Sequence, residues 1–544
     1  MKPTLPSLLA IMSLTIMGCD DQTPDEENPD ASEKPLLEQA VEAMGGAGSL
    51  NDLKRFRIES AGTRRIDYEG MEPSEVHDTS TYTRTYVHDL STDSLRVDTV
   101  RTSVFEAFQF FPPESYSVVL NGDVGGLTAQ AGFFPPGAMP SQHVGALRQQ
   151  QRLFNPHILL RFALANPAAV SDGGEEDYDG LSHRILAIMD QDVEVRLFVN
   201  PESGLISKLE TMENSPLFRD VPVEVRYEGW KQHGVFSFPT TVELYAVEGL
   251  VHEETRSSVD IEPADVAAGA FDLPPEAGTP EVDADEFAFG RQSHLVVEAF
   301  FQILFGYEQG GAVEVSELTP GVMLLSAGHN SLAALVDERL VVIEAPISPA
   351  HGTHIVETLA SEFPGVPISH VVQSHHHQDH SAGVRSLAAV GAKLVVGPGV
   401  KSFYEDVLAA SSTLRPDALS RVDVETEVEE VAQGATSEIA GPTVTVTAYH
   451  MSANTHSADL LLTLVDTGAA RVIYVADLYN AGVGFSPVLG GPESFFAAMR
   501  DLEIIDQDCV SELPLTIIPS HGLAQSLEDS ITELDGLEVD IGCP

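Results

Sequence analysis

The sequence predicts two folded domains: an antiparallel β-rich domain, then a domain in which helices cover the outer faces of sheets. At 544 residues the chain is too long for a single hydrophobic core. Between residues 56 and 261, many runs alternate apolar and polar side chains, as half-buried antiparallel strands do. Beyond residue 312, strand-like runs alternate with helical segments, which is typical of layered α/β domains.

Composition and these patterns together predict the domain boundaries. We expect an export signal at residues 1–19, an acidic tether at 20–35, the β-rich domain at 36–275, a linker with a helix at 276–311 and the second domain at 312–544. The linker opens with a segment rich in proline and acidic residues, and helical spacing returns at residues 286–307.

The first residues resemble a bacterial lipoprotein signal. A mostly apolar run at residues 5–17 precedes Gly18 and Cys19, and the resemblance implies that Cys19 carries a lipid. Because Lys2 is the one basic residue ahead of that run, a plain secretory signal with an incidental cysteine is the alternative. Residues 20–35 are acidic and almost free of apolar side chains, so we expect a disordered tether. The predicted location is the cell envelope, in the periplasm or at the cell surface, with a lipid anchor.

The formal net charge of -54 is spread along the whole chain. It argues against nucleic acid and anionic membrane surfaces as partners, and it favours a solvated acidic surface over an acidic binding face. The most apolar later stretch, residues 295–307, is too short to span a bilayer. Cys509 and Cys543 are expected to form a disulfide, since paired cysteines predominate in exported proteins.

The first domain should contain one large, curved antiparallel sheet that partly wraps helices, with one helix at residues 142–165. Residues 223–244, together with the FDLP sequence at 271–274, resemble the last strands of lipoprotein-carrier-like domains of bacterial envelopes. This resemblance implies a concave face that binds an acyl chain or another apolar ligand. A packed structural domain without a ligand is the alternative.

One loop in the second domain contains four side chains of metal-ligand type at H-x-H-x-D-H spacing: His375, His377, Asp379 and His380. A β-branched run at residues 368–373 predicts a strand before them, and residues 383–390 predict the start of a helix after them. The spacing suits two metals, because the backbone between strand and helix can turn the first two histidines toward one cation and the other pair toward a neighbour.

Two metals need further ligands, and three later strand-like runs each end near one. His456 follows the run at residues 444–449, Asp477 follows the run at 471–475, and His521 follows the run at 515–518. Side chains at the ends of strands can converge on one edge of a sheet sandwich. The seven side chains therefore predict a dinuclear metal site.

With these motifs, residues 318–522 resemble the metallo-β-lactamase fold superfamily. The resemblance implies an αβ/βα sandwich with two Zn²⁺ ions, in which His375, His377 and His456 hold the first metal. Asp379, His380 and His521 would hold the second, and Asp477 would bridge the two. Glu344 stands where the superfamily usually has an aspartate that orients the ligand loop.

The same resemblance implies hydrolysis of a small-molecule substrate by a metal-bridging hydroxide, with Asp379 also able to pass a proton onward. An aspartate bridge resembles hydrolases of thioesters, lactones and phosphodiesters, and β-lactam hydrolysis is an alternative. A second alternative is a non-catalytic envelope protein that binds an apolar ligand and has structural metals. Structural zinc sites use four ligands and leave no open position. The seven candidate ligands of this chain therefore argue against purely structural metals.

Other polar residues near the motifs are expected to have lesser roles. His376 and Gln378 should point away from the metals. His329 is expected to make a turn hydrogen bond, and an approach to the metals from the side is the alternative. Tyr479 and Asn480 could line the pocket or be structural. Four further histidines are expected to be surface or packing residues: His351, His354, His370 and His450.

Overall fold

Three large sheets form the framework of the computed structural model, which describes residues 35–543 except 68, 105–113, 132–135, 191–192, 248, 292–312 and 483–489. Residues Leu36–Pro544 make up one compact unit, distinct from Met1–Pro35. The predicted signal, Cys19, the tether and most of the linker helix lie outside the described residues. Within the described parts, no helix combines the length and the apolar composition needed to cross a membrane.

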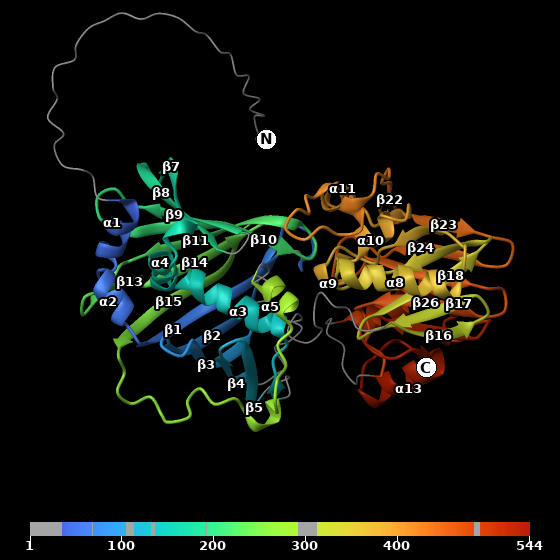
Figure 1. Ribbon diagram of the computed structural model, residues 1–544. Coiled ribbons are helices and arrows are strands. Elements are labelled where there is room, and N and C mark those ends of the chain that lie inside the picture. The colour runs from blue at the N-terminus through green and yellow to red at the C-terminus, as the bar shows by residue number, and fades with distance from the viewer. Residues whose placement is uncertain are drawn as a thin grey trace, which may run out of the picture. The chain divides into compact units, whose positions relative to one another are not determined.

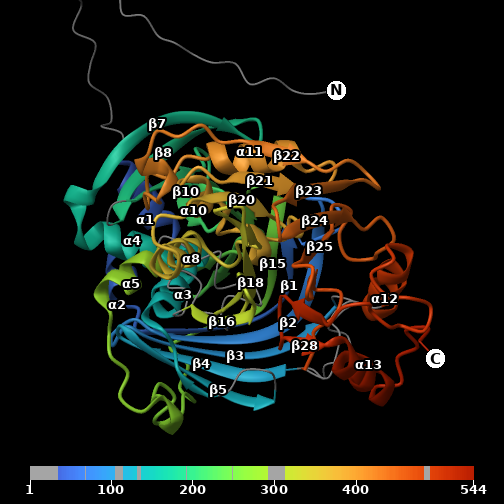
Figure 2. The same cartoon turned by 90° about the vertical axis from the view of Figure 1, so that its right-hand side faces the viewer.

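The first sheet has 13 strands, and every pair of neighbours in it is antiparallel (Figure 1). In spatial order its strands are β6 (Gly137–Ala138), β5 (Val124–Ala131), β4 (Glu114–Asn121), β3 (Ser94–Ser103), β2 (Val76–Asp89), β1 (Arg55–Asp67), β15 (Gly249–Ile261), β14 (Thr241–Ala246), β11 (Arg219–Glu228), β10 (Ile206–Ser215), β9 (Val193–Val199), β8 (Leu181–Asp190) and β7 (Val170–Tyr178). Strands β12 (Lys231–His233) and β13 (Phe236–Phe238) form a separate hairpin. Figure 2 shows β1 to β5 running side by side. The large antiparallel sheet is as predicted.

Successive side chains of each strand point to opposite faces of this sheet, so the apolar ones gather on one face. Helices pack on that face. Phe56 and Ile58 of β1 are buried in a core that also contains Leu153 of α3 (Ser141–Phe154) and Leu160 of α4 (Pro156–Ala165). Among the residues that the structure describes, three shorter helices also lie in this region, α1 (Leu36–Ala43), α2 (Ala47–Asp52) and α5 (Ala284–Gly290).

The single helix predicted at residues 142–165 is wrong, because the structure has two helices there. Asn155 leaves the helical conformation, with φ -127° and ψ 85°, and Pro156 starts the second helix. Proline lacks the N–H that would continue the first helix, and its ring disfavours helical geometry at the residue before it.

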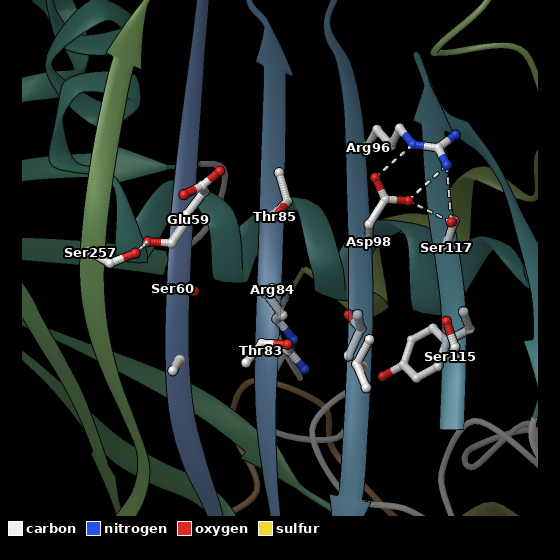
Figure 3. Close-up of a pocket in the computed structure, with 14 residues that line it drawn as sticks. Glu59, Ser60, Thr83, Arg84, Thr85, Arg96, Asp98, Ser115, Ser117 and Ser257 are labelled. Carbon is white, nitrogen blue, oxygen red and sulfur yellow. Dashed lines mark hydrogen bonds and ion pairs between the residues drawn. The ribbon is translucent and has the colours of Figure 1, made fainter. Parts of the chain in front are cut away.

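Over β1 to β4 the opposite face of the sheet is mostly polar. A hollow of about 620 Å³ lies over β1 to β4, and Figure 3 shows Arg96, Asp98 and Ser117 bonded to one another in it. Serine, threonine and charged side chains provide most of its lining. The apolar face is packed against the helices instead, and the expectation that this domain binds an apolar ligand stays a prediction.

The second half of the chain contains two sheets that pack face to face. The first has seven strands, in the spatial order β16 (Glu314–Thr319), β17 (Val322–Ser326), β18 (Asn330–Val336), β19 (Arg339–Ile343), β20 (Ile368–Val372), β21 (Lys393–Val396) and β22 (Val428–Glu430). The second has six, β23 (Thr436–Ala440), β24 (Thr445–His450), β25 (Leu461–Asp466), β26 (Arg471–Ala476), β27 (Leu515–Pro519) and β28 (Gln525–Ser526).

Successive side chains along each strand again point to opposite faces of the sheet, which explains why each sheet packs on two layers. Val341 and Ile343 of β19 pack in the core between the two sheets, whereas Leu340 and Val342 pack against helices on the outer side. The helices on that side are α8 (Pro349–Glu362), α10 (Val384–Ala388) and α11 (Lys401–Ala409). On the second sheet, α12 (Gly491–Asp501) and α13 (Leu527–Gly536) pack over β25 to β27. This helix–sheet–sheet–helix order agrees with the predicted αβ/βα sandwich.

A disulfide joins Cys509 to Cys543, with 5.6 Å between the Cα atoms. Cys509 is buried in the same core as Phe496 of α12 and Leu534 of α13. The bridge therefore ties the C-terminal residues to the helical layer that covers the second sheet.

Candidate metal centre

The ligand loop follows β20 and is held in place by Glu344, which is completely buried just after β19. One carboxylate oxygen of Glu344 accepts hydrogen bonds from the backbone N–H of Ser374, at 3.1 Å, and from the Gln373 amide, at 3.2 Å. The other accepts from the Ser374 hydroxyl at 3.1 Å. Glu344 has a φ of 73°, and Ala476 before Asp477 has 52°. Such strained backbone at strand ends is often found at functional sites.

Asp379 and His380 lie on a short helix, α9 (Gln378–Ser381), rather than on a loop, and the helix predicted from residue 383 follows as α10, which begins at Val384. The backbone N–H of Ser381 donates to the carbonyl of His377 at 3.0 Å, so the chain already turns helically at the motif. This geometry points Asp379 and His380 in directions different from His375 and His377, as a two-metal site requires.

His375, His377 and His456 form a first group, with one ligand atom from each within 4.8 Å of the others. Nε2 of His375 lies 3.0 Å from Nε2 of His456. Nδ1 of His375 bonds to the Ser374 hydroxyl at 2.9 Å, which leaves Nε2 to carry the lone pair that faces His456. Three neutral imidazoles around one point are the ligand set of many zinc sites.

A second group contains Asp379, His380, His521 and also His329, again with ligand atoms within 4.8 Å of one another. Nε2 of His521 lies 3.2 Å from a carboxylate oxygen of Asp379, and Nε2 of His380 lies 3.5 Å from the same oxygen. His329 makes the expected turn hydrogen bond, from Nδ1 to the carbonyl oxygen of Asn330 at 3.3 Å, and it also approaches the second group. Its ring lies 4.8 Å from that of His380 and 4.4 Å from that of His521, between centroids.

Asp477 stands between the two groups. Its Oδ2 lies 3.5 Å from Nε2 of His456 in the first group and 3.0 Å from Nε2 of His380 in the second. Its Oδ1 lies 3.6 Å from Nε2 of His521 and makes no hydrogen bond, although it is buried. A carboxylate in this position is suited to bridging two cations.

Burial and neighbouring charges set the protonation of the site. Burial holds the pKa values of His375 and His377 well below the usual range, which favours the neutral, ligand-competent form. Burial also lowers the pKa of His380, but Asp379, Asp477 and Glu344 outweigh it and raise that pKa well above the usual value. Burial alone would raise the pKa of Asp477, yet the charges of His380 and His521 hold it well below its usual value.

The residues fit a pair of divalent cations. The donor set is three nitrogens on one side and a carboxylate with imidazoles on the other, and the buried Oδ1 of Asp477 lacks a hydrogen-bond donor. Six of the seven side chains predicted as ligands lie in these two groups, and the seventh, Asp477, forms a further set with His375 and His380.

Sequence reasoning missed a contribution from the first half of the chain. Between β1 and β2, the carbonyl oxygen of Gly70 accepts from Nε2 of His377 at 2.9 Å, and a carboxylate oxygen of Glu69 accepts from the backbone N–H of Gln378 at 3.1 Å. Burial, with the nearby Asp379, raises the pKa of Glu69 well above its usual range. No local signal marks these residues, because their partners are 307 and 309 positions away.

Several other residues have structural contacts. Nδ1 of His376 lies 2.7 Å from a carboxylate oxygen of Asp459, so this ring points away from both groups, as predicted. The Tyr479 hydroxyl donates to Glu533 at 2.8 Å, which ties it to α13. His450 bonds to the carbonyl of Ala458 at 3.0 Å and packs as expected.

No protein family model matches this chain, and none of the curated proteins matches it. Among solved structures, a metallo-β-lactamase from Cronobacter sakazakii with a HARLDQ motif is 17% identical, with 39% of this chain and 80% of that chain covered and a TM-score of 0.29. The mono-zinc form of FIM-1 from Pseudomonas aeruginosa is 16% identical, with 42% and 96% covered and a TM-score of 0.31. A metallo-β-lactamase from Pontibacter korlensis is 13% identical, with 42% and 99% covered and a TM-score of 0.31.

Proposed function

We propose that this protein is a dinuclear zinc hydrolase that acts on an ester-like bond of a small molecule. The observation that carries the proposal is the position of Asp477, whose Oδ2 lies 3.5 Å from His456 in one histidine group and whose Oδ1 lies 3.6 Å from His521 in the other. A carboxylate shared by two ligand groups supports two adjacent metals rather than two separate structural sites.

In this proposal, His375, His377 and His456 hold the first zinc, and Asp379, His380 and His521 hold the second, with Asp477 between them. When bound, a zinc pair supplies a water of lowered pKa as the nucleophile and a Lewis acid for the scissile carbonyl or phosphoryl oxygen. Seven ligands shared by two adjacent cations differ from the closed set of four ligands around one cation in structural zinc sites.

The chain's own residues orient and shield the reaction. Asp379 lies 3.2 Å from Nε2 of His521 and is the carboxylate placed to accept a proton from the attacking water. Glu344 holds His380 through Nδ1, which keeps Nε2 directed toward Asp477. His375 and His380 are completely buried, whereas the side chains of His456 and His521 are partly exposed, so the centre opens to solvent on the side of these two residues.

Thioesters, lactones and phosphodiesters are the proposed substrate classes, and β-lactams are the alternative. The decisive experiment joins metal analysis to hydrolysis of one substrate from each class by the parent protein, by Asp379→Ala and by a control, Asp406→Ala, which changes an exposed aspartate of α11. We expect two zinc ions per parent chain and turnover of one class, lost in Asp379→Ala and retained in Asp406→Ala.

Fewer than two zinc ions in the parent, or turnover that survives Asp379→Ala, would contradict the proposed function. Two zinc ions without turnover of any class would favour the non-catalytic alternative, in which the metals are structural.

The proposal also places the protein in the cell envelope, anchored by a lipid on Cys19. It is supported by the apolar run at residues 5–17, by Gly18 before Cys19 and by the acidic stretch that follows. In this arrangement the lipid is the contact with the membrane, and the acidic chain is unsuited to nucleic acid.

A further inference from the structure

His329 is held rigidly beside the metal centre at the turn between β17 and β18. The next residue, Asn330, donates from its backbone N–H to the carbonyl of Ser520 at 2.9 Å. Its side-chain amide donates to the carbonyls of Pro519 at 2.9 Å and Gly522 at 3.0 Å. These bonds tie the turn to both sides of His521, so His329 cannot move independently of a predicted ligand.

The ring of His329 has one nitrogen engaged and one free to bind. Nδ1 lies 3.3 Å from the carbonyl oxygen of Asn330, which requires a proton on Nδ1 and leaves the lone pair on Nε2. Nε2 is buried and has no hydrogen-bond partner, and the side chain is 2% exposed. A histidine that donates one ring N–H to a backbone carbonyl and directs the other nitrogen inward has the arrangement usual for metal-binding histidines.

An isolated buried acceptor costs free energy unless something satisfies it. His329 offers one ligand atom within 4.8 Å of those of Asp379, His380 and His521. A cation among these three residues would satisfy Nε2 directly, without a change in the turn.

We propose that His329 is a fourth protein ligand of the second metal and binds it through Nε2. The inference rests on the metal-binding part of the proposed function. It makes the two positions unequal, because the second has four side-chain ligands before Asp477 is counted, whereas the first has three histidines. With Asp477 counted at both, the first position has four side-chain ligands and the second has five, so the first has more room for water or substrate.

The test measures zinc affinity of the full-length protein by competition with a chromophoric chelator. To isolate the second position, His456→Ala provides a background in which the first has lost a ligand. In that background we compare His329→Phe, which fills the space of the ring, with His329→Gln. His351→Phe is the control, since His351 is a buried histidine of α8 that lies in none of the ligand groups.

We expect zinc affinity at the second position to fall at least about tenfold in both His329 variants and to stay within about threefold of the background in His351→Phe. Cobalt in place of zinc should show a changed visible spectrum in the His329 variants alone, as expected for a lost imidazole ligand. Circular dichroism of the metal-free variants checks that they fold. If His329→Phe does not fold, His329→Gln provides the test.

Unchanged zinc affinity together with an unchanged cobalt spectrum would overturn the inference and leave the proposed hydrolase intact. A parent protein that takes up no zinc would overturn both, and the two failures are thereby distinguished.

Discussion

The carboxylate of Glu344 contacts Nδ1 of His380, and both side chains are completely buried. This contact leaves Nε2 of His380 facing Asp477 at 3.0 Å. A residue outside the ligand set thus decides which nitrogen of a ligand points inward. The same carboxylate holds the backbone of the ligand loop at Ser374, so one side chain positions both the loop and the imidazole.

Replacement of Glu344 should therefore damage both stability and metal binding. We expect Glu344→Ala to destabilise the metal-free protein by about 3 kcal/mol or more, because it removes the carboxylate at Nδ1 of the buried His380 and the acceptor of the Ser374 N–H. Zinc affinity should fall by about ten- to a hundredfold. Urea unfolding and chelator competition measure the two effects, with Glu357→Gln on the exposed side of α8 as the control. Unchanged zinc affinity would show that Glu344 has no positioning role.

The loop between β1 and β2 should support the first metal position. Glu69→Ala removes the acceptor for the Gln378 N–H, whereas Glu69→Gln retains one. If the loop positions His377 through Gly70, zinc affinity should fall about tenfold in the alanine variant and by no more than about threefold in the glutamine variant. Glu72→Ala, an exposed change in the same loop, is the control. Equal losses of zinc affinity in Glu69→Ala and Glu69→Gln would instead show that the charge of Glu69, rather than its hydrogen bond, causes the effect.

Acid should destabilise the first domain. Burial lowers the pKa values of His88 and His157 to about 3, below the unfolded value of 6.5. Between about pH 3 and pH 6.5 the unfolded chain therefore binds more protons than the folded chain. The free energy of unfolding falls as the pH drops below about 6.5. At pH 5 each histidine should cost about 2 kcal/mol relative to pH 7.

The measurement is urea unfolding at both pH values, followed by the fluorescence of Trp230, the single tryptophan, which packs against this core. His157→Phe should lose about half of the pH difference while keeping the stacked contact with Phe238. His233→Gln, at the half-buried end of β12, is the control. An unchanged pH difference in His157→Phe would contradict the assignment.

Loss of the disulfide between Cys509 and Cys543 should destabilise the second domain. The cysteines are 34 positions apart, and closing a loop of that length restricts the unfolded chain by about 4 kcal/mol on the chain-entropy model. The free energy of unfolding of Cys509→Ser/Cys543→Ser, measured with urea, should be lower than that of the parent by about this amount. Reductant should lower the urea midpoint of the parent but not that of the variant. Free thiols in the folded, exported parent, detected by alkylation and mass measurement, would contradict the bridge.

The lipid anchor is tested by detergent partitioning after expression in a bacterial envelope. The parent should partition with membranes, and so should the variant that lacks the disulfide, because both keep Cys19. Cys19→Ala should leave the membrane fraction. Recovery of Cys19→Ala in the same membrane fraction as the parent would argue against lipidation.

Much of the candidate site was predictable because its signals are local. The H-x-H-x-D-H spacing located four ligand-type residues on one loop, and the ends of strand-like runs located His456, Asp477 and His521. The structure brings these seven together. The antiparallel sheet was predictable for the same reason, since alternation of side chains is written into adjacent residues. The break between α3 and α4 was also a local signal, at Pro156, and was overlooked.

The sequence by itself determined which side chains are available and how neighbours along the chain are spaced, because those properties need no knowledge of distant residues. Tertiary structure alone decided that His329 joins the second group, that Gly70 bonds to His377, and that Glu344 orients His380. Each of these contacts joins residues far apart in the chain, and the burial that shifts the pKa values of the histidines arises from the same packing. Distances across space, rather than along the chain, set both ligand geometry and proton affinity.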